Sequence, residues 1–167
     1  MDFKKLANQY RDELLDNVLP FWLEHSQDIE FGGYFSCLDR EGKVFDTDKF
    51  IWLQGREVWM FSMLYNKVEK RQEWLDCAVL GGEFLKKYGH NGDYNWYFSL
   101  NRSGRPLVEP YNIFSYTFAT MAFGQLSLAT GSQEYADIAK KTFEIILSKV
   151  DNPKGKCCLL YTSPSPE

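Results

Sequence analysis

Two segments of the chain repeat one pattern about 62 residues apart. Residues 34–43 read YFSCLDREGK and residues 97–105 read YFSLNRSGR. Both contain Tyr-Phe-Ser, then Leu, an acid or amide, Arg, one further residue, Gly and a basic residue, and the first copy has one insertion. Each copy is strand-like on both sides of a polar turn, which predicts a β-hairpin between two helices. The spacing therefore predicts a repeat of helical pairs.

A repeat of helical pairs restricts the fold, because each pair buries its apolar faces mainly against neighbouring pairs. Apolar spacings of three and four predict helices at about residues 2–25, 51–69, 72–88 and 111–129, and a last helix with Ser132 as its N-cap. Pro20 is expected to end or kink the first helix. Aromatic helix faces without a polar cap predict an all-α fold, an unfinished ring of helical pairs with short β-hairpins between helices.

Composition and charge narrow the class of protein. The 167 residues suit one domain, and the 17% of aromatic residues suffice for a sizeable core. Lys plus Arg number 19 against 23 Asp plus Glu, so no nucleic-acid partner is expected. No stretch approaches about 20 apolar residues and the amino terminus has no apolar signal core, which predicts a cytoplasmic protein without a membrane partner. The four cysteines, Cys37, Cys77, Cys157 and Cys158, are expected to be reduced thiols.

One arginine lies in the run FIWLQGREVW, where nearly everything else is apolar or aromatic. A guanidinium keeps its charge, so Arg56 must find partners or face a wet cavity. Trp52, Arg56 and Trp59 share one face of the predicted helix. Indole faces stack on the C–H faces of sugar rings and a guanidinium donates to oxygen, so the trio suits a carbohydrate. The alternative is a structural salt bridge from Arg56 to Glu57 or Asp48.

Several motifs resemble one family in order and spacing. The run FWLEHSQDIEFGGYFSCLDREGKVFD, followed by KFIWLQGREVWMFSMLYN, is similar to the amino-terminal part of the N-acylglucosamine 2-epimerase family, also called renin-binding proteins. GGEFLKKY, SLNRSGRP and NIFSYTFATMAF continue the similarity, which covers about residues 1–155. Other branches of the family are cellobiose 2-epimerases and aldose-ketose isomerases. The resemblance implies that the chain forms part of an (α/α)6 barrel.

The resemblance also implies a set of substrate-binding residues. The arginine of the WLQGR motif binds substrate in the family, and it matches Arg56. Three side chains near it on the predicted helix are weaker candidates, with core packing as the alternative. Two more, in NIFSYTF, lie where related enzymes contact the sugar, although many relatives have an acidic residue at the position of Tyr116. The expected substrate-binding residues are Arg56, Trp52, Gln54, Trp59, Ser115 and Tyr116.

The implied reaction interconverts N-acetylglucosamine and N-acetylmannosamine. Epimerisation at C2 opens the sugar ring, removes the proton next to the C1 aldehyde and returns it to the opposite face. The family uses two histidines supported by a glutamate, because imidazole titrates near neutral pH. Neither His25 nor His90 matches them, and we expect a structural role for the first and a solvated loop position for the second. No catalytic residue is therefore expected in this segment, which should be inactive alone.

The resemblance extends to ligands and partners. No cofactor or metal is expected to be required, and ATP is implied as an allosteric activator that is not consumed. The implied substrate is a small amino sugar, and the full-length chain is expected to form a homodimer. The alternatives are a cellobiose 2-epimerase or an aldose-ketose isomerase, and a non-catalytic helical-repeat fragment that binds a sugar or a protein.

The last residues differ from the rest of the chain. After SKVDNPKGK comes CCLLYTSPSPE, which has no helical period and resembles the translation of a sequencing-library adapter. We therefore expect residues 1–156 to be the amino-terminal part of the barrel domain and residues 157–167 to be a non-native tail. The alternative is a genuine tail rich in Ser and Pro.

Overall fold

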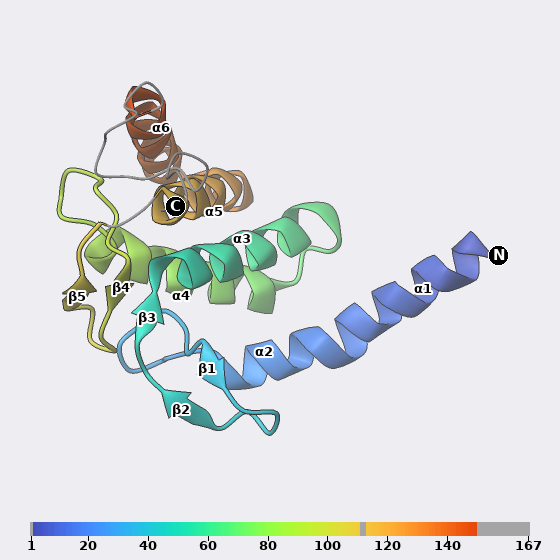
Figure 1. Ribbon diagram of the computed structural model, residues 1–167. Helices are drawn as coiled ribbons and strands as arrows, with labels where there is room; N and C mark the ends of the chain where they lie inside the picture. The colour runs from blue at the N-terminus through green and yellow to red at the C-terminus, as the bar shows by residue number, and fades with distance from the viewer. Residues whose placement is uncertain (1, 111–112, 150–167) are drawn as a thin grey trace, which may run out of the picture.

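The computed structural model describes residues 2–110 and 113–149 (Figure 1). The first predicted helix is one continuous rod of three elements, α1 (Phe3–Glu13), the π-helical η1 (Leu14–Val18) and α2 (Leu19–His25). Asp2 caps it, since its Oδ1 accepts hydrogen bonds from the backbone N–H groups of Lys4 and Lys5, both at 3.1 Å. Pro20 does not end the helix. It lies in the first turn of α2, directly after the wider π-helical turn, where a missing N–H is tolerated.

The other four predicted helices are confirmed within a few residues, as α3 (Ile51–Lys67), α4 (Gln72–Tyr88), α5 (Phe114–Thr130) and α6 (Gln133–Ser148). Figure 1 shows α3 beside α4, with α5 and α6 following, and α3 contacts both α4 and α5. A Cβ on Gly55 would lie 3.0 Å from the backbone of Phe118, so the glycine allows α3 and α5 to approach closely. Ser132 is the N-cap residue of α6, but its side chain makes no capping hydrogen bond.

Both predicted hairpins are present. Strands β1 (Cys37–Leu38) and β2 (Val44–Asp46) form the first, and β4 (Ser99–Leu100) and β5 (Pro106–Val108) form the second. The sequence did not predict β3 (Lys49–Phe50), which pairs antiparallel with β4 and makes the order β3-β4-β5. Since β3 leads directly into α3, the second hairpin holds the start of that helix.

The two hairpin turns are built alike, which supports the predicted repeat. Asp39 Oδ1 and Asn101 Oδ1 each accept a backbone N–H four residues ahead, both at 2.8 Å. Gly42 and Gly104 have φ angles of 84° and 91°, a region that favours glycine. A Cβ on either glycine would strike an aromatic ring at the end of the preceding helix, 2.3 Å from His25 or 2.5 Å from Tyr88. Each turn therefore closes over the helix before it.

A buried ionic cluster joins the two hairpins. Lys49 Nζ donates to Asp28 Oδ2 at 2.9 Å and to the carbonyl oxygens of Gly32 and Arg102 at 2.6 and 3.0 Å. Arg102 binds both carboxylate oxygens of Asp28, at 2.9 and 3.0 Å. The side chains of Asp28 and Lys49 are fully buried. The cluster connects the loop before the first hairpin, strand β3 and the turn of the second hairpin.

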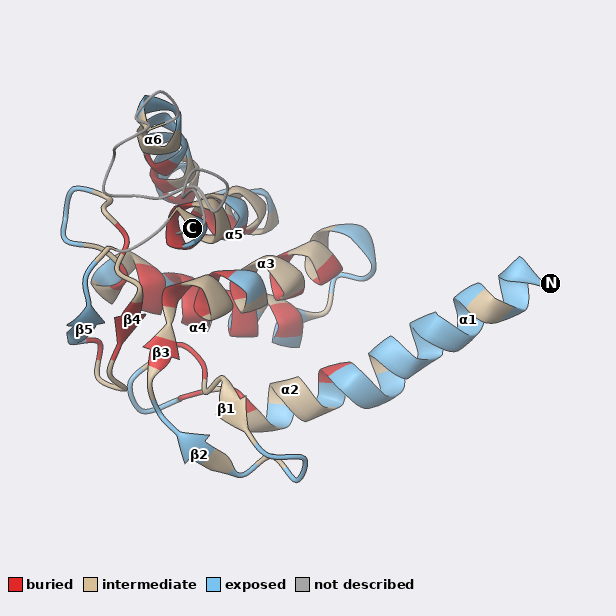
Figure 2. Cartoon of the chain, in the orientation of Figure 1, coloured by how far each residue is buried: buried red, intermediate tan, exposed pale blue. Residues whose placement is uncertain are grey.

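The core lies between α3, α4 and α5, where most buried residues gather (Figure 2). In contrast α1 contains no buried residue, and Phe3 and Tyr10 are 74% and 70% exposed. Apolar side chains of α5 and α6 are covered unevenly. Phe114, Met121 and Phe143 are exposed, whereas Phe118 and Ile146 are half-buried.

Two further expectations concern cysteines and membranes. Cys37 and Cys77 are free, and Cys157 and Cys158 lie outside the described residues. None of the helices in the described ranges has both the length and the apolar character needed to cross a membrane.

Candidate functional site

Arg56 lies in the second turn of α3, and its side chain is exposed. Its Cζ atom is 5.7 Å from the ring centroids of both Trp52 and Phe118, within the range of cation–π attraction. Among the described residues Arg56 forms no ion pair, so the expected alternative of a salt bridge with Glu57 or Asp48 is not observed. The guanidinium therefore keeps its hydrogen-bond donors for a ligand.

Two hollows lie next to Arg56. The first has a volume of about 360 Å³ and is lined by Trp22, Ser36, Leu53, Arg56, Glu57, Trp59 and Met60; we call it the arginine pocket. The second, of about 290 Å³, is lined by Trp52, Phe98, Phe114 and Phe118; we call it the aromatic pocket. Trp52 and Trp59 thus line different hollows, although both are near Arg56. The indole and phenyl faces of both pockets offer stacking surfaces for a sugar ring near the guanidinium.

The hydroxyl of Ser36 adds a polar group to the arginine pocket. Its Oγ atom is buried and has no hydrogen-bond partner. A buried hydroxyl without a partner is unfavourable, and a ligand or water oxygen would satisfy it. The arginine pocket therefore combines a free guanidinium, a free hydroxyl and two indole rings.

Glu57 also lines the arginine pocket, but its carboxyl group points toward α2 rather than to Arg56. Its Oε1 atom lies 2.5 Å from Oγ of Ser26, which is fully buried. Burial raises the pKa of Glu57 to about 8, because the charged form loses its water. The sequence suggested Glu57 only as a salt-bridge partner for Arg56. The structure shows no such salt bridge, so that prediction is wrong.

Gln54 does not join this group. It is fully buried on another face of α3, and its amide makes two hydrogen bonds to the backbone of Tyr34. Gln54 Oε1 accepts from the N–H of Tyr34, and Nε2 donates to the carbonyl oxygen, both at 2.8 Å. Both ends of the amide are therefore used in hydrogen bonds to Tyr34, and a substrate contact from Gln54 stays a prediction.

Ser115 and Tyr116 also lie apart from Arg56. Both are buried, and neither lines the arginine or the aromatic pocket. The Tyr116 hydroxyl donates to Oδ1 of Asn95 at 3.2 Å, so the side chain ties α5 to the loop before the second hairpin. Their neighbours Phe114 and Phe118 line the aromatic pocket instead. The spacing of four between these phenylalanines was the signal that could have identified them.

The two histidines have local partners. The ring of His25 packs against Phe21 with centroids 4.9 Å apart and lies under the turn at Gly42. Nδ1 of His90 accepts from the N–H of Gly92 at 3.0 Å, and its ring stacks on Tyr94. Burial lowers the pKa of His90. Neither histidine lines the pockets near Arg56.

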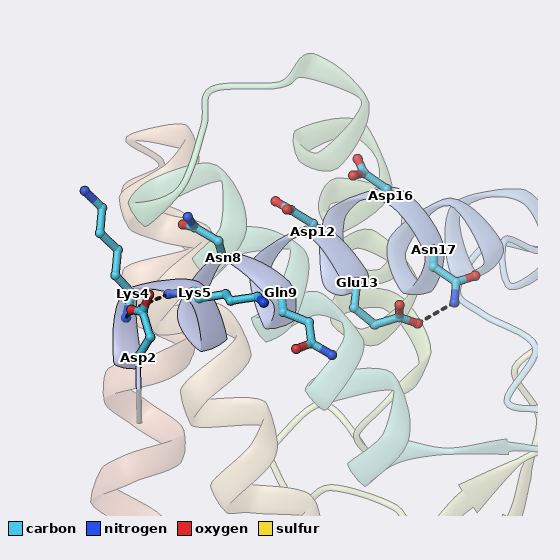
Figure 3. Close-up of a pocket in the computed structure, with 9 residues that line it drawn as sticks. All are labelled: Asp2, Lys4, Lys5, Asn8, Gln9, Asp12, Glu13, Asp16 and Asn17. Atoms are coloured by element: carbon cyan, nitrogen blue, oxygen red, sulfur yellow. Dashed lines mark hydrogen bonds between the residues drawn. The ribbon is translucent and has the colours of Figure 1, made fainter.

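Other parts of the described chain offer less. Within residues 2–110 and 113–149, no three His, Cys, Asp or Glu side chains come together as a metal site would need. A shallow hollow of about 860 Å³ runs along α1 (Figure 3). Its lining consists of polar side chains from the segment Asp2–Asn17 alone, such as Glu13, which accepts a hydrogen bond from Asn17. With no second element opposite, it is the solvated face of a helix.

Comparison with known proteins agrees with the sequence resemblance. The family model for N-acylglucosamine 2-epimerase matches residues 33–164. Its end falls in the segment predicted to be a non-native tail, which lies outside the described residues. The chain is 44% identical to the N-acylglucosamine 2-epimerase of Mus musculus over 149 residues, covering 86% of this chain and 36% of that protein. For the Homo sapiens protein the identity is also 44%, covering 80% and 32%.

Solved structures show the same relationship. Cellobiose 2-epimerase from Bacillus thermoamylovorans B4167 superposes with a TM-score of 0.78 at 28% identity, covering 87% of this chain and 37% of that one. A sugar epimerase from a ruminal bacterium gives 0.79 at 27% identity, covering 86% and 37%. The chain spans about a third of the length of the curated relatives it matches. Over that third, the chain belongs to the N-acylglucosamine 2-epimerase family.

Proposed function

We propose that the chain is the amino-terminal part of a sugar 2-epimerase that interconverts N-acetylglucosamine and N-acetylmannosamine. One observation carries the proposal: Arg56 has no ion pair among the described residues, lines the arginine pocket and lies against two rings of the aromatic pocket. A guanidinium beside aromatic faces binds the oxygens of a sugar while the rings cover its C–H faces. Trp52 and Trp59 belong to this proposed site, together with Phe114 and Phe118.

The amino-sugar substrate is favoured over the alternatives by relative similarity. The N-acylglucosamine 2-epimerases are 43–44% identical to this chain, against 27–30% for the cellobiose 2-epimerases. Cellobiose remains the second candidate, because cellobiose 2-epimerases are among the solved structures that superpose on this chain. The proposal includes an (α/α)6 barrel for the whole protein, to which these helices contribute, a cytoplasmic location, a homodimer and activation by ATP. These rest on the family resemblance.

The proposed reaction moves a proton at C2 of the open-chain sugar. In this segment Arg56 would bind and orient the sugar, and the proton-transfer groups would come from elsewhere in the protein. His25 and His90 are packed against other rings and away from the pockets. We therefore expect no exchange of deuterium into C2 of N-acetylmannosamine when the 167-residue chain is incubated alone in heavy water. Measurable exchange would contradict the assignment of proton transfer to other residues.

Sugar binding tests the proposed site directly. N-acetylmannosamine and cellobiose are titrated separately into the 167-residue chain by calorimetry, and the amino sugar is expected to bind more tightly. Arg56→Lys keeps the charge but loses the planar fork, so its affinity should fall about tenfold, or about 1.4 kcal/mol. Arg40→Lys, on the exposed turn of the first hairpin, is the matched control. Unchanged affinity in Arg56→Lys would return Arg56 to a structural role, and tighter binding of cellobiose would favour the second candidate.

A further inference from the structure

Arg56 and Glu57 are neighbours on α3 and line the same pocket, yet they form no ion pair. Opposite charges in a partly enclosed pocket attract each other strongly. Some feature of the structure must therefore hold Glu57 away from Arg56, or remove its charge.

The two contacts of Ser26 suit an uncharged Glu57. Ser26 Oγ lies 2.6 Å from the carbonyl oxygen of Trp22 and 2.5 Å from Oε1 of Glu57. A hydroxyl has one proton to donate, and a carbonyl oxygen can only accept. If Ser26 donates to Trp22, a carboxylate at Glu57 would face the Ser26 oxygen with no proton between them. A protonated Glu57 resolves this, because its O–H donates to Ser26 Oγ.

The surroundings of Glu57 agree with a neutral acid. Tyr34, in the first loop, and Cys77, in α4, are titratable groups that interact electrostatically with Glu57. Burial raises the pKa of both, so each stays uncharged at neutral pH and neither offers Glu57 a counter-charge. Arg56 is the cation that shares its pocket, and in the described part of the chain no Lys, Arg or His pairs with Glu57.

We propose that Glu57 is a positioning residue: as an uncharged carboxylic acid held by Ser26, it leaves the Arg56 guanidinium open to a ligand oxygen in the arginine pocket. The inference rests on the proposed function, since it treats Arg56 as the group that binds the sugar. A neutral Glu57 leaves the pocket with one net positive charge. A charged Glu57 has no O–H to donate to Ser26, and its negative charge would be attracted to Arg56, where it would occupy the donors that the sugar needs.

The arrangement has a direct pH consequence. Glu57 stays protonated up to about pH 8 and ionises above it. Affinity for N-acetylmannosamine should therefore fall about tenfold between about pH 6.5 and about pH 9, as the new carboxylate captures Arg56. In Glu57→Gln the amide still donates to Ser26 and cannot ionise, so affinity should be the same at both pH values. Glu41→Gln, an exposed glutamate in the turn of the first hairpin, should retain the pH dependence of the parent chain.

The experiment combines calorimetric titration of these three proteins with difference infrared spectroscopy. The carbonyl band of a protonated carboxylic acid should be present in the parent chain at about pH 7, absent in Glu57→Gln, and lost from the parent above about pH 8. A parent affinity that does not change with pH, or an equal fall in Glu57→Gln, would overturn the positioning role. A missing carboxylic-acid band would overturn the neutral state. Failure of every variant to bind the sugar at any pH would instead contradict the proposed function, while the infrared band would still decide the state of Glu57.

Discussion

The hairpins β1–β2 and β4–β5 use the same turn, in which an Asp or Asn oxygen accepts backbone amides and a glycine has a positive φ. Their surroundings differ. Arg40 in the first turn is exposed, whereas the corresponding Arg102 binds Asp28 in the buried cluster. The first hairpin is a separate two-stranded sheet, and the second shares a sheet with β3. The same type of turn is thus an exposed loop in the first hairpin, whereas in the second hairpin it is part of the buried ionic cluster that joins the two hairpins.

The helices that follow the two hairpins, α3 and α5, also differ in their polar character. Helix α3 has Arg56 and Glu57 in its second turn, whereas α5 contains no charged residue. The first of these helices provides the charged groups of the candidate site, and α5 provides part of the aromatic lining, Phe114 and Phe118. The repeat is therefore a shared scaffold, and its chemistry is concentrated in one copy.

The largest expected effect tests the buried ionic cluster that joins the two hairpins. Asp28→Asn leaves Lys49 fully buried without a counter-charge, which should lower the free energy of unfolding by about 3–5 kcal/mol. Burial alone would raise the pKa of Asp28, but the hydrogen bonds from Arg102 and Lys49 outweigh it and hold the pKa below its usual value. The carboxylate thus stabilises the fold above about pH 4, and the effect is lost as pH falls through the folded pKa.

Urea unfolding of the parent chain and Asp28→Asn at about pH 7 and about pH 3 measures this effect. The gap between the two proteins should shrink at the lower pH. Arg40→Ala is the control from the first hairpin and should change the free energy of unfolding by less than about 0.5 kcal/mol. Equal losses of unfolding free energy in Arg40→Ala and Asp28→Asn would contradict the difference between the exposed first turn and the buried ionic cluster.

The second effect tests the contrast between α3 and α5. The folded chain keeps the Glu57 proton up to about pH 8, whereas an unfolded glutamate releases it near about pH 4.3. Stability should therefore fall as pH rises between these values, and Glu57→Gln should remove the fall. The substitution should raise the free energy of unfolding by about 2 kcal/mol or more at pH 8 and have little effect at about pH 4. Urea midpoints across this range measure it, and a constant gap at all pH values would show that Glu57 does not titrate abnormally.

The third effect compares the two turn glycines. Alanine at either position is strained by its positive φ and strikes a ring of the preceding helix. Tyr88 packs on Phe84 with centroids 5.3 Å apart, and the second hairpin is held by Arg102, so neither side can move easily. We expect Gly104→Ala to lower the free energy of unfolding by about 2–3 kcal/mol and Gly42→Ala by about 1–2 kcal/mol. Thermal unfolding of both variants would show whether the order is reversed.

Local patterns in the sequence predicted much of the fold. The bounds of α4 match the prediction, and the turn glycines follow from the repeated motif. Strand β3 was missed because two residues are too few for an alternating pattern. The buried ionic cluster was not predicted from the sequence, because Asp28 and Arg102 are 74 residues apart in the chain.

The candidate site was predicted less completely. The exposed position of Arg56 follows from its charge, which cannot be buried without a partner. The inward direction of Gln54 depends on Tyr34, and the state of Glu57 depends on Ser26, which is 31 residues away. No helical pattern contains such contacts. The aromatic wall at Phe118 likewise depends on how α5 packs beside α3.

The exposed helix α1 has a consequence for proteolysis. Its backbone hydrogen bonds are not covered by any buried side chain of its own, so it can open locally while α3, α4 and α5 remain folded. A helix of 11 residues without tertiary packing is marginal in water. Trypsin should therefore cleave after Lys4, Lys5 and Arg11 long before it reaches the core, and amide hydrogens in α1 should exchange at rates set by fraying. The first helix would be digested while Arg56 and its pockets are still in place.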